Sequence, residues 1–558
     1  GLTRVVLPAR LTAIPDCCFN NCEKLPGIAI PETVTSIGSC AFRYCSALTA
    51  ITLPQGLQTL GANAFLYCEN LPYVDVPDTL ESAGSYIASD TTQLRCSIGS
   101  SAAYALSKKN NSFYNNGYGL CYTYADRDGS VTGLALLKYA GTEAEVRVPD
   151  GVTELLYLSF CSNSAVTSVI LPETVVKIGE KAFSECKNLT SVTIPQGVVE
   201  IQSAAFSMCP KLTVIDIPDG LQKAARLAED NVQFRCSFGS SAAFALSKGG
   251  NNFCAGDFQM RYLFDDDGNR NGLRLNKYLG TDTEVTVPEE VTETGSAFKD
   301  CKTVTKVVLP AGLTKLESNI FSGCTGLKEI VIPEGVTLIG NGAFRDCKAL
   351  TELALPRGLK KIESYVFIGC TGLSYIDIPD GVETIDGHIV NEPTQLRCTL
   401  GSSAAIALSK SDNGFCVDGL RLCYGFDDDG NTNGLTVKRY LGSETEVTVP
   451  DGVDSVGSNA FYDCKGLTKL ALPQGLKEIG GNAFLGCEGL SYIDIPDGVE
   501  TVGDWIASES IQLRCSIGSS AAIALSKAEQ NFCVDDFAVR HSFTDGGAVN
   551  GLIAERYV

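Results

Sequence analysis

Residues 350–370 read LTELALPRGLKKIESYVFIGC, and residues 467–487 repeat this stretch closely as LTKLALPQGLKEIGGNAFLGC. Leu350, Leu353 and Leu355 have the spacing of a short strand with one face turned inward. The same spacing returns in the second copy. This stretch therefore predicts one turn of a repeated structure that begins with a short strand.

The second half of the unit predicts how the turn continues and closes. Pro356 cannot donate to a strand ladder, so it ends the first strand, and Gly358 supports the bend that follows. Leu359 and Ile362 predict a second short strand. Phe367 predicts a helical or 3₁₀ turn that closes the coil and places a large ring in its interior.

Proline gives the period of the repeat. Within each of four runs, successive prolines lie 23 residues apart, with one step of 22, which is the range expected of a solenoid and gives about sixteen coils in all. The series consists of Pro8, Pro31, Pro54, Pro77, Pro149, Pro172, Pro195, Pro218, Pro288, Pro310, Pro333, Pro356, Pro379, Pro450, Pro473 and Pro496. One such coil cannot bury enough apolar surface alone, so stacking of neighbours must supply the stability.

Two residue types recur at fixed places in the coil. A phenylalanine at one height predicts a stacked aromatic column, formed by Phe42, Phe65, Phe183, Phe206, Phe321, Phe344, Phe367, Phe461 and Phe484. A cysteine stands at one constant spacing after the proline in Cys22, Cys45, Cys68, Cys186, Cys209, Cys324, Cys347, Cys370, Cys464 and Cys487. Because no histidine accompanies these thiols at ligand spacing, buried structural thiols are favoured over a metal ladder.

A second module occurs four times between the blocks of coils. It begins QLRCSIGSSAAYALSK at 93–108, with close copies at 233–248, 395–410 and 512–527. This pattern predicts a strand, a Gly-Ser turn and a helix capped by serine. A hairpin with an Asp/Asn/Gly turn follows, as in FDDDGNRNGL.

The motif IxLPxGLxxIGxxAFxxC resembles that of the BspA-like leucine-rich-repeat family of bacterial surface proteins. The predicted fold is an α/β repeat solenoid whose leucine-rich-repeat coils are interrupted by four copies of a small strand–helix–hairpin module. The predicted boundaries are block 1 (1–92), module A (93–146), block 2 (147–232), module B (233–285), block 3 (286–394), module C (395–447), block 4 (448–511) and module D (512–558), with module D as the C-terminal cap.

The resemblance also implies a role in recognition. It implies a secreted or cell-surface protein that is not an enzyme and that binds a protein such as a host matrix protein. The alternatives are a spacer that presents another domain, and an enzyme or a glycan or calcium binder acting through the modules. Residue 1 falls inside a repeat, so we expect further sequence, including any secretion signal, ahead of it.

Composition excludes two classes of partner. The net charge is −21 and the pI is near 4.6, whereas nucleic acids and anionic membranes require a basic surface. The sequence also contains no apolar run of the ~20 residues that cross a bilayer. We therefore expect neither nucleic-acid binding nor membrane insertion.

Tyrosine and aspartate mark the last coil of three blocks. They are Tyr73 with Asp75, Tyr375 with Asp377, and Tyr492 with Asp494, whereas block 2 has Val214 with Asp216. Strand alternation places these side chains outside the coil, where exposed tyrosine is a favoured interface anchor. The alternative, which we favour, is that each tyrosine packs on the module that follows it.

Other candidate chemistry is weak. The acidic turns at Asp265, Asp266 and Asp267 and at Asp427, Asp428 and Asp429 fail the spacing of an EF-hand, so we expect at most weak calcium binding. The only histidines, His388 and His541, lie in different modules, so no repeated base accompanies a serine.

Three modules carry a cysteine pair at one shared spacing, formed by Cys236 with Cys254, Cys398 with Cys416, and Cys515 with Cys533. Each pair brackets the predicted helix, and a strand–helix–strand arrangement can bring its two ends together. This spacing permits a disulfide without requiring one, and buried free thiols are the favoured state.

Overall fold

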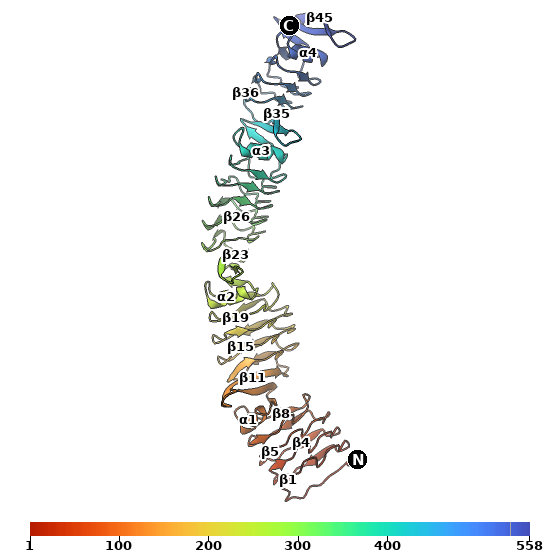
Figure 1. The fold of residues 1–558 in the computed structure, drawn as a ribbon, viewed down its shortest axis with the longest axis vertical. Helices are drawn as coiled ribbons and strands as arrows, with labels where there is room; N and C mark the ends of the chain where they lie inside the picture. Colours follow the sequence, from red (N-terminus) through yellow and green to blue (C-terminus); the bar gives the residue numbers. More distant parts are fainter. Residues whose placement is uncertain (536, 558) are drawn as a thin grey trace. The chain divides into compact units, whose positions relative to one another are not determined.

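A computed structural model describes residues 1–535 and 537–557. The chain divides into two compact units, Gly1–Asn271 and Gly272–Val558. Each unit is a solenoid of stacked coils, and Figure 1 shows the coils, the modules and the four short helices along the sequence. The predicted repeat solenoid is therefore confirmed.

Within each block, the first strands of successive coils lie side by side, and we call the side of the solenoid that they form the first-strand face. Its strands come just before the proline and run parallel, and each buries its middle residue between flanking residues that are exposed or half-buried. They are β2 (Gly27–Ala29), β4 (Ala50–Thr52), β6 (Tyr73–Asp75), β12 (Glu145–Arg147), β14 (Ser168–Ile170), β16 (Ser191–Thr193), β18 (Val214–Asp216), β24 (Glu284–Thr286), β25 (Lys306–Val308), β27 (Glu329–Val331), β30 (Tyr375–Asp377), β36 (Glu446–Thr448), β38 (Lys469–Ala471) and β40 (Tyr492–Asp494). Residues 352–354 hold the same place without forming a strand.

Within each block, the strands after the proline pair in parallel and form the second-strand face. Its members are mostly two residues long: β1 (Ala13–Ile14), β3 (Ser36–Ile37), β5 (Thr59–Leu60), β7 (Ser82–Ala83), β13 (Val152–Leu155), β15 (Lys177–Ile178), β17 (Glu200–Ile201), β19 (Lys223–Ala224), β26 (Lys315–Leu316), β28 (Leu338–Ile339), β29 (Lys361–Ile362), β31 (Thr384–Ile385), β37 (Ser455–Val456), β39 (Glu478–Ile479) and β41 (Thr501–Val502). Neighbouring strands pair equivalent residues, as Ile339 pairs with Ile362.

The turn that closes each coil differs from the prediction. Around Phe367 the chain forms hydrogen-bonded turns instead of a helical or 3₁₀ segment. Tyr365 and Gly369 adopt positive φ angles of 62° and 78°, which breaks any helical run. The amide of Phe367 bonds the carbonyl of Ile389 in the next coil, so inter-coil bonding replaces helical bonding.

The aromatic column is confirmed. Phe298, Phe321, Phe344 and Phe367 stack with ring centroids 5.4 to 5.9 Å apart, and all are buried. A tyrosine from the hairpin of the preceding module starts the column, since Tyr440 stacks on Phe461 at 5.6 Å. The column therefore joins each module to the next block.

The four modules have the predicted order of strand, helix and hairpin. Their helices are α1 (Ser101–Ser107), α2 (Ser241–Lys248), α3 (Ser403–Lys410) and α4 (Ser520–Lys527). The predicted serine caps are confirmed, since Ser100, Ser240, Ser402 and Ser519 each accept a hydrogen bond from the third amide that follows.

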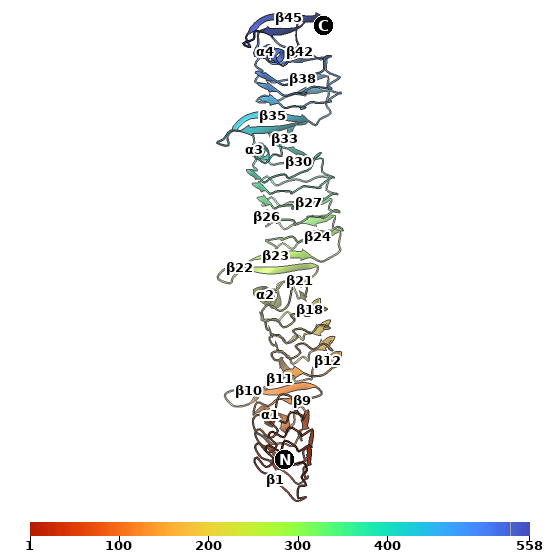
Figure 2. The same cartoon turned by 90° about the vertical axis from the view of Figure 1, so that its right-hand side faces the viewer.

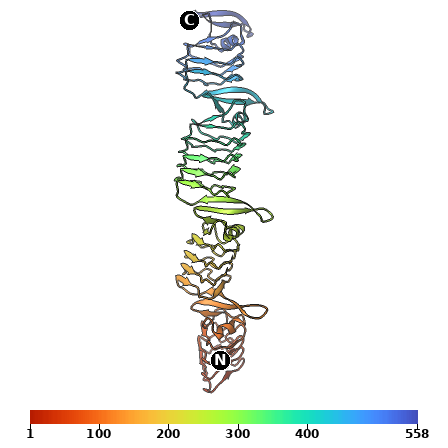
Figure 3. The ribbon, with the colours of Figure 1, turned by 90° about the vertical axis from the view of Figure 1, so that its left-hand side faces the viewer.

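In the sequence of each module, one strand precedes the helix and three strands follow it. They are β8 (Gln93–Arg95), β9 (Phe113–Asn115), β10 (Tyr118–Tyr124) and β11 (Val131–Tyr139) in module A; β20 (Gln233–Arg235), β21 (Phe253–Ala255), β22 (Phe258–Phe264) and β23 (Arg270–Tyr278) in module B; β32 (Gln395–Arg397), β33 (Phe415–Val417), β34 (Leu420–Phe426) and β35 (Thr432–Tyr440) in module C; and β42 (Gln512–Arg514), β43 (Phe532–Val534), β44 (Phe537–Phe543) and β45 (Val549–Tyr557) in module D. Figures 2 and 3 show the long hairpin strands β10 with β11 and β34 with β35 beside the short strands of the coils.

The hairpins of modules A and C connect the two faces. In module C, β32 pairs with β30 of the first-strand face, and β35 pairs with β37 of the second-strand face. The strand order β30-β32-β33-β34-β35-β37 is therefore one continuous sheet. In module D, β45 is exposed along its whole length, so its predicted role as a cap stays a prediction.

Candidate functional site

The three predicted tyrosine and aspartate pairs lie on β6, β30 and β40, the last first-strand element of their blocks. Tyr73, Tyr375 and Tyr492 are 41, 46 and 41% exposed, so strand alternation placed them correctly outside the coil. Each pair is adjacent to the first strand of the following module, since Tyr375 and Asp377 pair in register with Gln395 and Arg397.

An arginine of the module covers one side of each tyrosine. The guanidinium carbons of Arg95, Arg397 and Arg514 lie 3.8, 3.4 and 3.9 Å from the centres of the rings of Tyr73, Tyr375 and Tyr492. The tyrosines therefore contact the following module, as the favoured interpretation expected, and a large part of each tyrosine stays exposed. The QLRC motif contained this arginine, but the sequence did not connect it with the tyrosine of the preceding coil.

The aspartates differ between blocks. Asp377 accepts two hydrogen bonds from Arg397, at 2.7 and 2.9 Å, and the bond raises the pKa of Arg397. Asp216 binds Arg235 in the same two-pronged manner. In blocks 1 and 4 the arginine instead bonds the glutamine of its own strand, so Asp75 and Asp494 keep their carboxylates open to a partner.

A hollow lies beside each of two such clusters. The one on block 3 measures about 670 Å³ and is lined by Thr351, Glu352, Tyr375, Asp377 and Arg397 among others. Its counterpart at block 4 measures about 610 Å³ and includes Asp494 and Arg514. Both open on the first-strand face, where a flat ring, a cation and carboxylates lie together.

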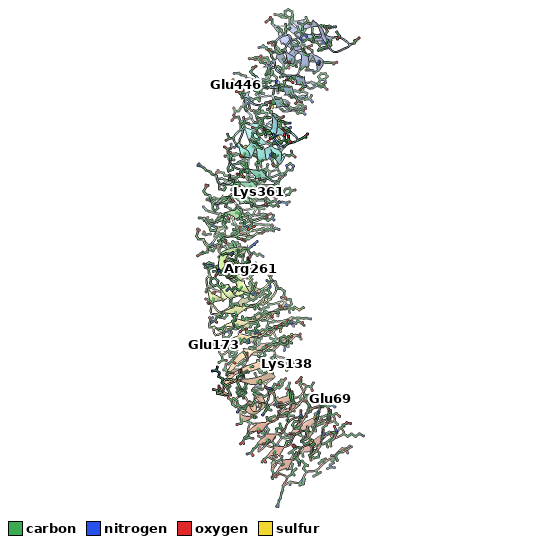
Figure 4. All side chains as sticks on the ribbon, in the orientation of Figure 1. Glu69, Lys138, Glu173, Arg261, Lys361 and Glu446 are labelled. Atoms are coloured by element: carbon green, nitrogen blue, oxygen red, sulfur yellow. The ribbon has the colours of Figure 1, made fainter. Side chains whose placement is uncertain are left out.

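Block 3 also carries apolar side chains on the first-strand face. Val308 is 42% exposed and Val331 is 70% exposed, and Ala354 occupies the same position in the next coil. We call Val308, Val331 and Ala354 the apolar stripe. Block 4 places Thr448 and Ala471 at this position, and beside them Glu446, labelled in Figure 4, bonds Lys469 at 3.3 Å.

The ladder cysteines serve the coil backbone. Eight of the ten thiols donate to the carbonyl of the phenylalanine 26 residues earlier, at 2.9 to 3.2 Å: Cys45, Cys68, Cys186, Cys209, Cys324, Cys347, Cys370 and Cys487. Burial raises the pKa of Cys186 and Cys324 to about 12. At neutral pH Cys186 and Cys324 therefore stay protonated, whereas catalysis and metal binding require the ionised sulfur.

The module cysteines are free thiols. Cys236 follows the end of β20 and Cys254 lies on the adjoining strand β21, and the amide of Cys236 donates to the carbonyl of Cys254 at 3.1 Å. Burial raises the pKa of both thiols to about 11. The pairs Cys398 with Cys416 and Cys515 with Cys533 are likewise unbonded.

The histidines do not form a catalytic group. His388 is exposed at the last coil of block 3, and not in a module as the sequence interpretation had it, and His541 is buried on β44 against the ring of Phe532 at 5.6 Å. Neither ring nitrogen of His541 has a hydrogen-bond partner within the described residues.

The acidic turns are held by their own first aspartate. Asp265 accepts from the amide of Asn269 at 2.7 Å, and Asp427 accepts from the amide of Asn431 at 2.8 Å. No group of three or more His, Cys, Asp or Glu side chains that could hold a metal ion occurs in residues 1–535 and 537–557. Calcium binding at these turns stays a prediction.

Across the described part of the chain, no helix combines the length and the apolar character needed to span a membrane. The helices contain seven or eight residues.

Solved structures similar to this chain include leucine-rich-repeat proteins. A leucine-rich repeat protein from Bacteroides ovatus is 21% identical, with 72% of this chain and 90% of that chain covered and a TM-score of 0.24. A leucine rich cell surface protein from Faecalibacterium prausnitzii is 20% identical, with 72% and 88% covered and a TM-score of 0.18. The pneumococcal vaccine antigen PcpA is 15% identical, with 72% and 98% covered and a TM-score of 0.20.

No curated protein matches the chain. The family described as the BspA type leucine rich repeat region matches residues 1–118, 143–233, 281–398 and 440–524, which is more than half of the sequence. These ranges contain the proline-spaced coils of all four blocks and the start of each module. The chain therefore belongs to the BspA-type leucine-rich-repeat family.

Proposed function

We propose that this chain is a non-enzymatic bacterial cell-surface or secreted protein that recognises another protein through the first-strand face of block 3. The observation that carries the proposal is the exposed apolar stripe, which ends at the hollow of Tyr375, Asp377 and Arg397. Apolar side chains next to an aromatic ring and a paired arginine are the usual composition of the energetic centre of a protein interface.

The stripe distinguishes recognition from a spacer role. Exposure of an apolar side chain such as Val331 to water is unfavourable. A spacer that only holds another domain does not require exposed apolar side chains on its sheet, whereas a binding surface does. The polar rim supports the same function, since Lys306 and Glu329 pair at 2.7 Å beside the stripe. Host matrix proteins are the class of partner that the family resemblance favours, and attachment is the role that would follow.

The test is binding of the whole chain to an immobilised panel of matrix proteins, mucins and glycans, with a salt titration. We expect saturable binding to a protein, which Val331→Asp weakens at least about tenfold because it places a charge inside a buried contact. Tyr375→Ala is expected to weaken it by a similar factor.

The matched control is Ala471→Asp, which adds the same charge at the same position of block 4. This change is expected to leave binding unaltered. Binding that survives Val331→Asp and Tyr375→Ala would move the site away from block 3, and no binding to any protein would leave the spacer as the better function.

A further inference from the structure

Modules C and D each enclose a hollow that the first-strand face does not share. In module C it measures about 280 Å³ and is lined by His388, Glu392, Asn413, Arg421 and Arg439 among others. It lies between the last coil of the block, the end of the helix and the hairpin.

The module D hollow is built from the equivalent positions and is larger. It measures about 420 Å³, and its lining includes Trp505, Glu509, Gln530, Ala538 and Arg556. Sequence alignment of the two modules places these five residues at the positions of His388, Glu392, Asn413, Arg421 and Arg439.

An arginine of the module itself lines the module C hollow. Arg421 donates from Nη1 to Oε1 of Glu392 at 2.7 Å and from Nη2 to the carbonyl of Asn413 at 2.8 Å. The guanidinium thus bridges an acidic side chain of the last coil and a carbonyl just after α3. A carboxylate and a carbonyl at the C-terminal end of a helix both carry negative charge or partial charge, so both favour a cation.

Module B also holds a guanidinium at the equivalent site, but the arginine comes from a different segment of the chain. Arg226 donates from Nη2 to Oδ1 of Asp230 at 2.6 Å and from Nη1 to the carbonyl of Gly250 at 2.6 Å. Asp230 is the equivalent of Glu392, whereas Arg226 occupies the position of His388. Two arginines from different segments therefore satisfy the same acid and the same end of the helix.

Module D keeps the acceptors and lacks both arginines. Trp505 replaces the arginine of module B, and Ala538 replaces the arginine of module C. Glu509 keeps the acidic position, and Glu529 adds a second carboxylate to the lining. Trp505 is 67% exposed, so its indole face is open to a cation at the rim of the hollow.

We propose that the module D hollow binds the guanidinium of an arginine side chain of a partner protein. Glu509 and the carbonyls after α4 accept its hydrogen bonds, as their counterparts accept those of Arg421, and Trp505 covers its flat face. This site is separate from the apolar stripe and does not depend on the function proposed for that stripe.

Arg556 does not occupy the position proposed for the arginine of the partner. Its Nη2 donates to the backbone carbonyl of Glu509 at 3.1 Å, which leaves the carboxylate of Glu509 for another donor. In module C the equivalent Arg439 lines the hollow together with Arg421, so two guanidinium groups share one such space.

The single tryptophan of the chain is a reporter for this site. The probe is the blocked peptide acetyl-Gly-Arg-Gly amide, titrated against the whole chain while the fluorescence of Trp505 is followed. The matched control peptide carries citrulline, which has the shape of arginine without its charge. We expect saturable quenching by the arginine peptide with a dissociation constant of about 1 mM and at least about tenfold weaker quenching by the citrulline peptide.

Two variants test the geometry. Glu509→Gln alters an exposed side chain, so it leaves the fold intact. It is expected to weaken binding of the arginine peptide at least about tenfold. Ala538→Arg recreates the arrangement of Arg421 and is expected to abolish binding because the hollow fills from within. Equal quenching by both peptides, or arginine binding that is unchanged in either variant, would overturn the proposal.

Discussion

The thiol of Cys324 donates a hydrogen bond to the backbone carbonyl of Phe298 at 2.9 Å, across the boundary between two successive coils. The same bond recurs in other coils, so a residue type that often signals disulfides or metal sites here satisfies the backbone of a buried turn. Cysteine suits this place because it is small and apolar and still carries a weak donor.

Removal of this thiol is expected to loosen the coils that it joins. Cys324→Ala leaves a small cavity and an unpaired carbonyl, so we expect a loss of about 1–2 kcal/mol of local stability. Hydrogen exchange of the amides between residues 298 and 324 measures the change. Cys18→Ala, at an exposed thiol, is the control and should not alter exchange.

Stability should fall at alkaline pH. Burial raises the pKa of Cys186 and Cys324 to about 12, whereas an unfolded thiol has a pKa of about 8.5. Above the unfolded pKa the native state binds more protons than the unfolded chain, so the free energy of unfolding decreases as the pH rises towards 12. The check is the thermal midpoint between pH 7 and pH 10.5. The variant Cys186→Ala with Cys324→Ala should show a shallower decline, and an identical decline would contradict the assignment.

All cysteines should be titratable as thiols. The structure contains 24 free cysteines, with Cys17 and Cys18 exposed and most ladder positions buried. A thiol reagent under denaturing conditions without reductant should therefore detect 24 thiols, whereas the native chain should react first at Cys17 and Cys18 because buried thiols are inaccessible. A count lower by two for each module would show that pairs such as Cys236 with Cys254 oxidise.

Module D should become more stable if its buried histidine is changed to tyrosine. His541 takes the place of Tyr122 of module A, whose hydroxyl accepts a hydrogen bond from the amide of Gly99 at 2.9 Å. His541→Tyr should restore that bond and remove two unpartnered ring nitrogens, which stabilises the module by about 1 kcal/mol. Hydrogen exchange of the amides of α4 measures this gain in stability. The control is His388→Tyr at an exposed site, which should not slow the exchange of α4.

The joint between module C and block 4 should depend on one ring. Tyr440 is buried on Phe461, and its amide bonds the carbonyl of Ala460 at 2.7 Å. Tyr440→Ala is expected to lower the local free energy of unfolding by about 3 kcal/mol and to raise the rate of amide hydrogen exchange at β36 and β37. Tyr462→Ala removes a ring of the same type that is 55% exposed, and a similar effect of the two changes would argue against the joint.

The sequence by itself determined the coil. Its prolines set the period, the alternation of apolar residues set two short strands, and the recurring Phe and Cys set the columns, because a repeated local pattern has only one way to bury its apolar face repeatedly. The serine caps and the hairpin turns of the modules were also predictable, since both are local chemistry.

Only the tertiary structure decided what depends on residues far apart in the chain. The stacking of Arg397 on Tyr375 joins a module to the coil before it, and the bonds from Arg226 to the carbonyl of Gly250 and from Arg421 to Glu392 join segments that no local pattern connects. The closing turn was mispredicted for the same reason, because amides such as those of Tyr365 and Phe367 bond carbonyls of the next coil. Contacts between coils fix these features, and a one-dimensional pattern does not specify which side chain reaches across to which neighbour.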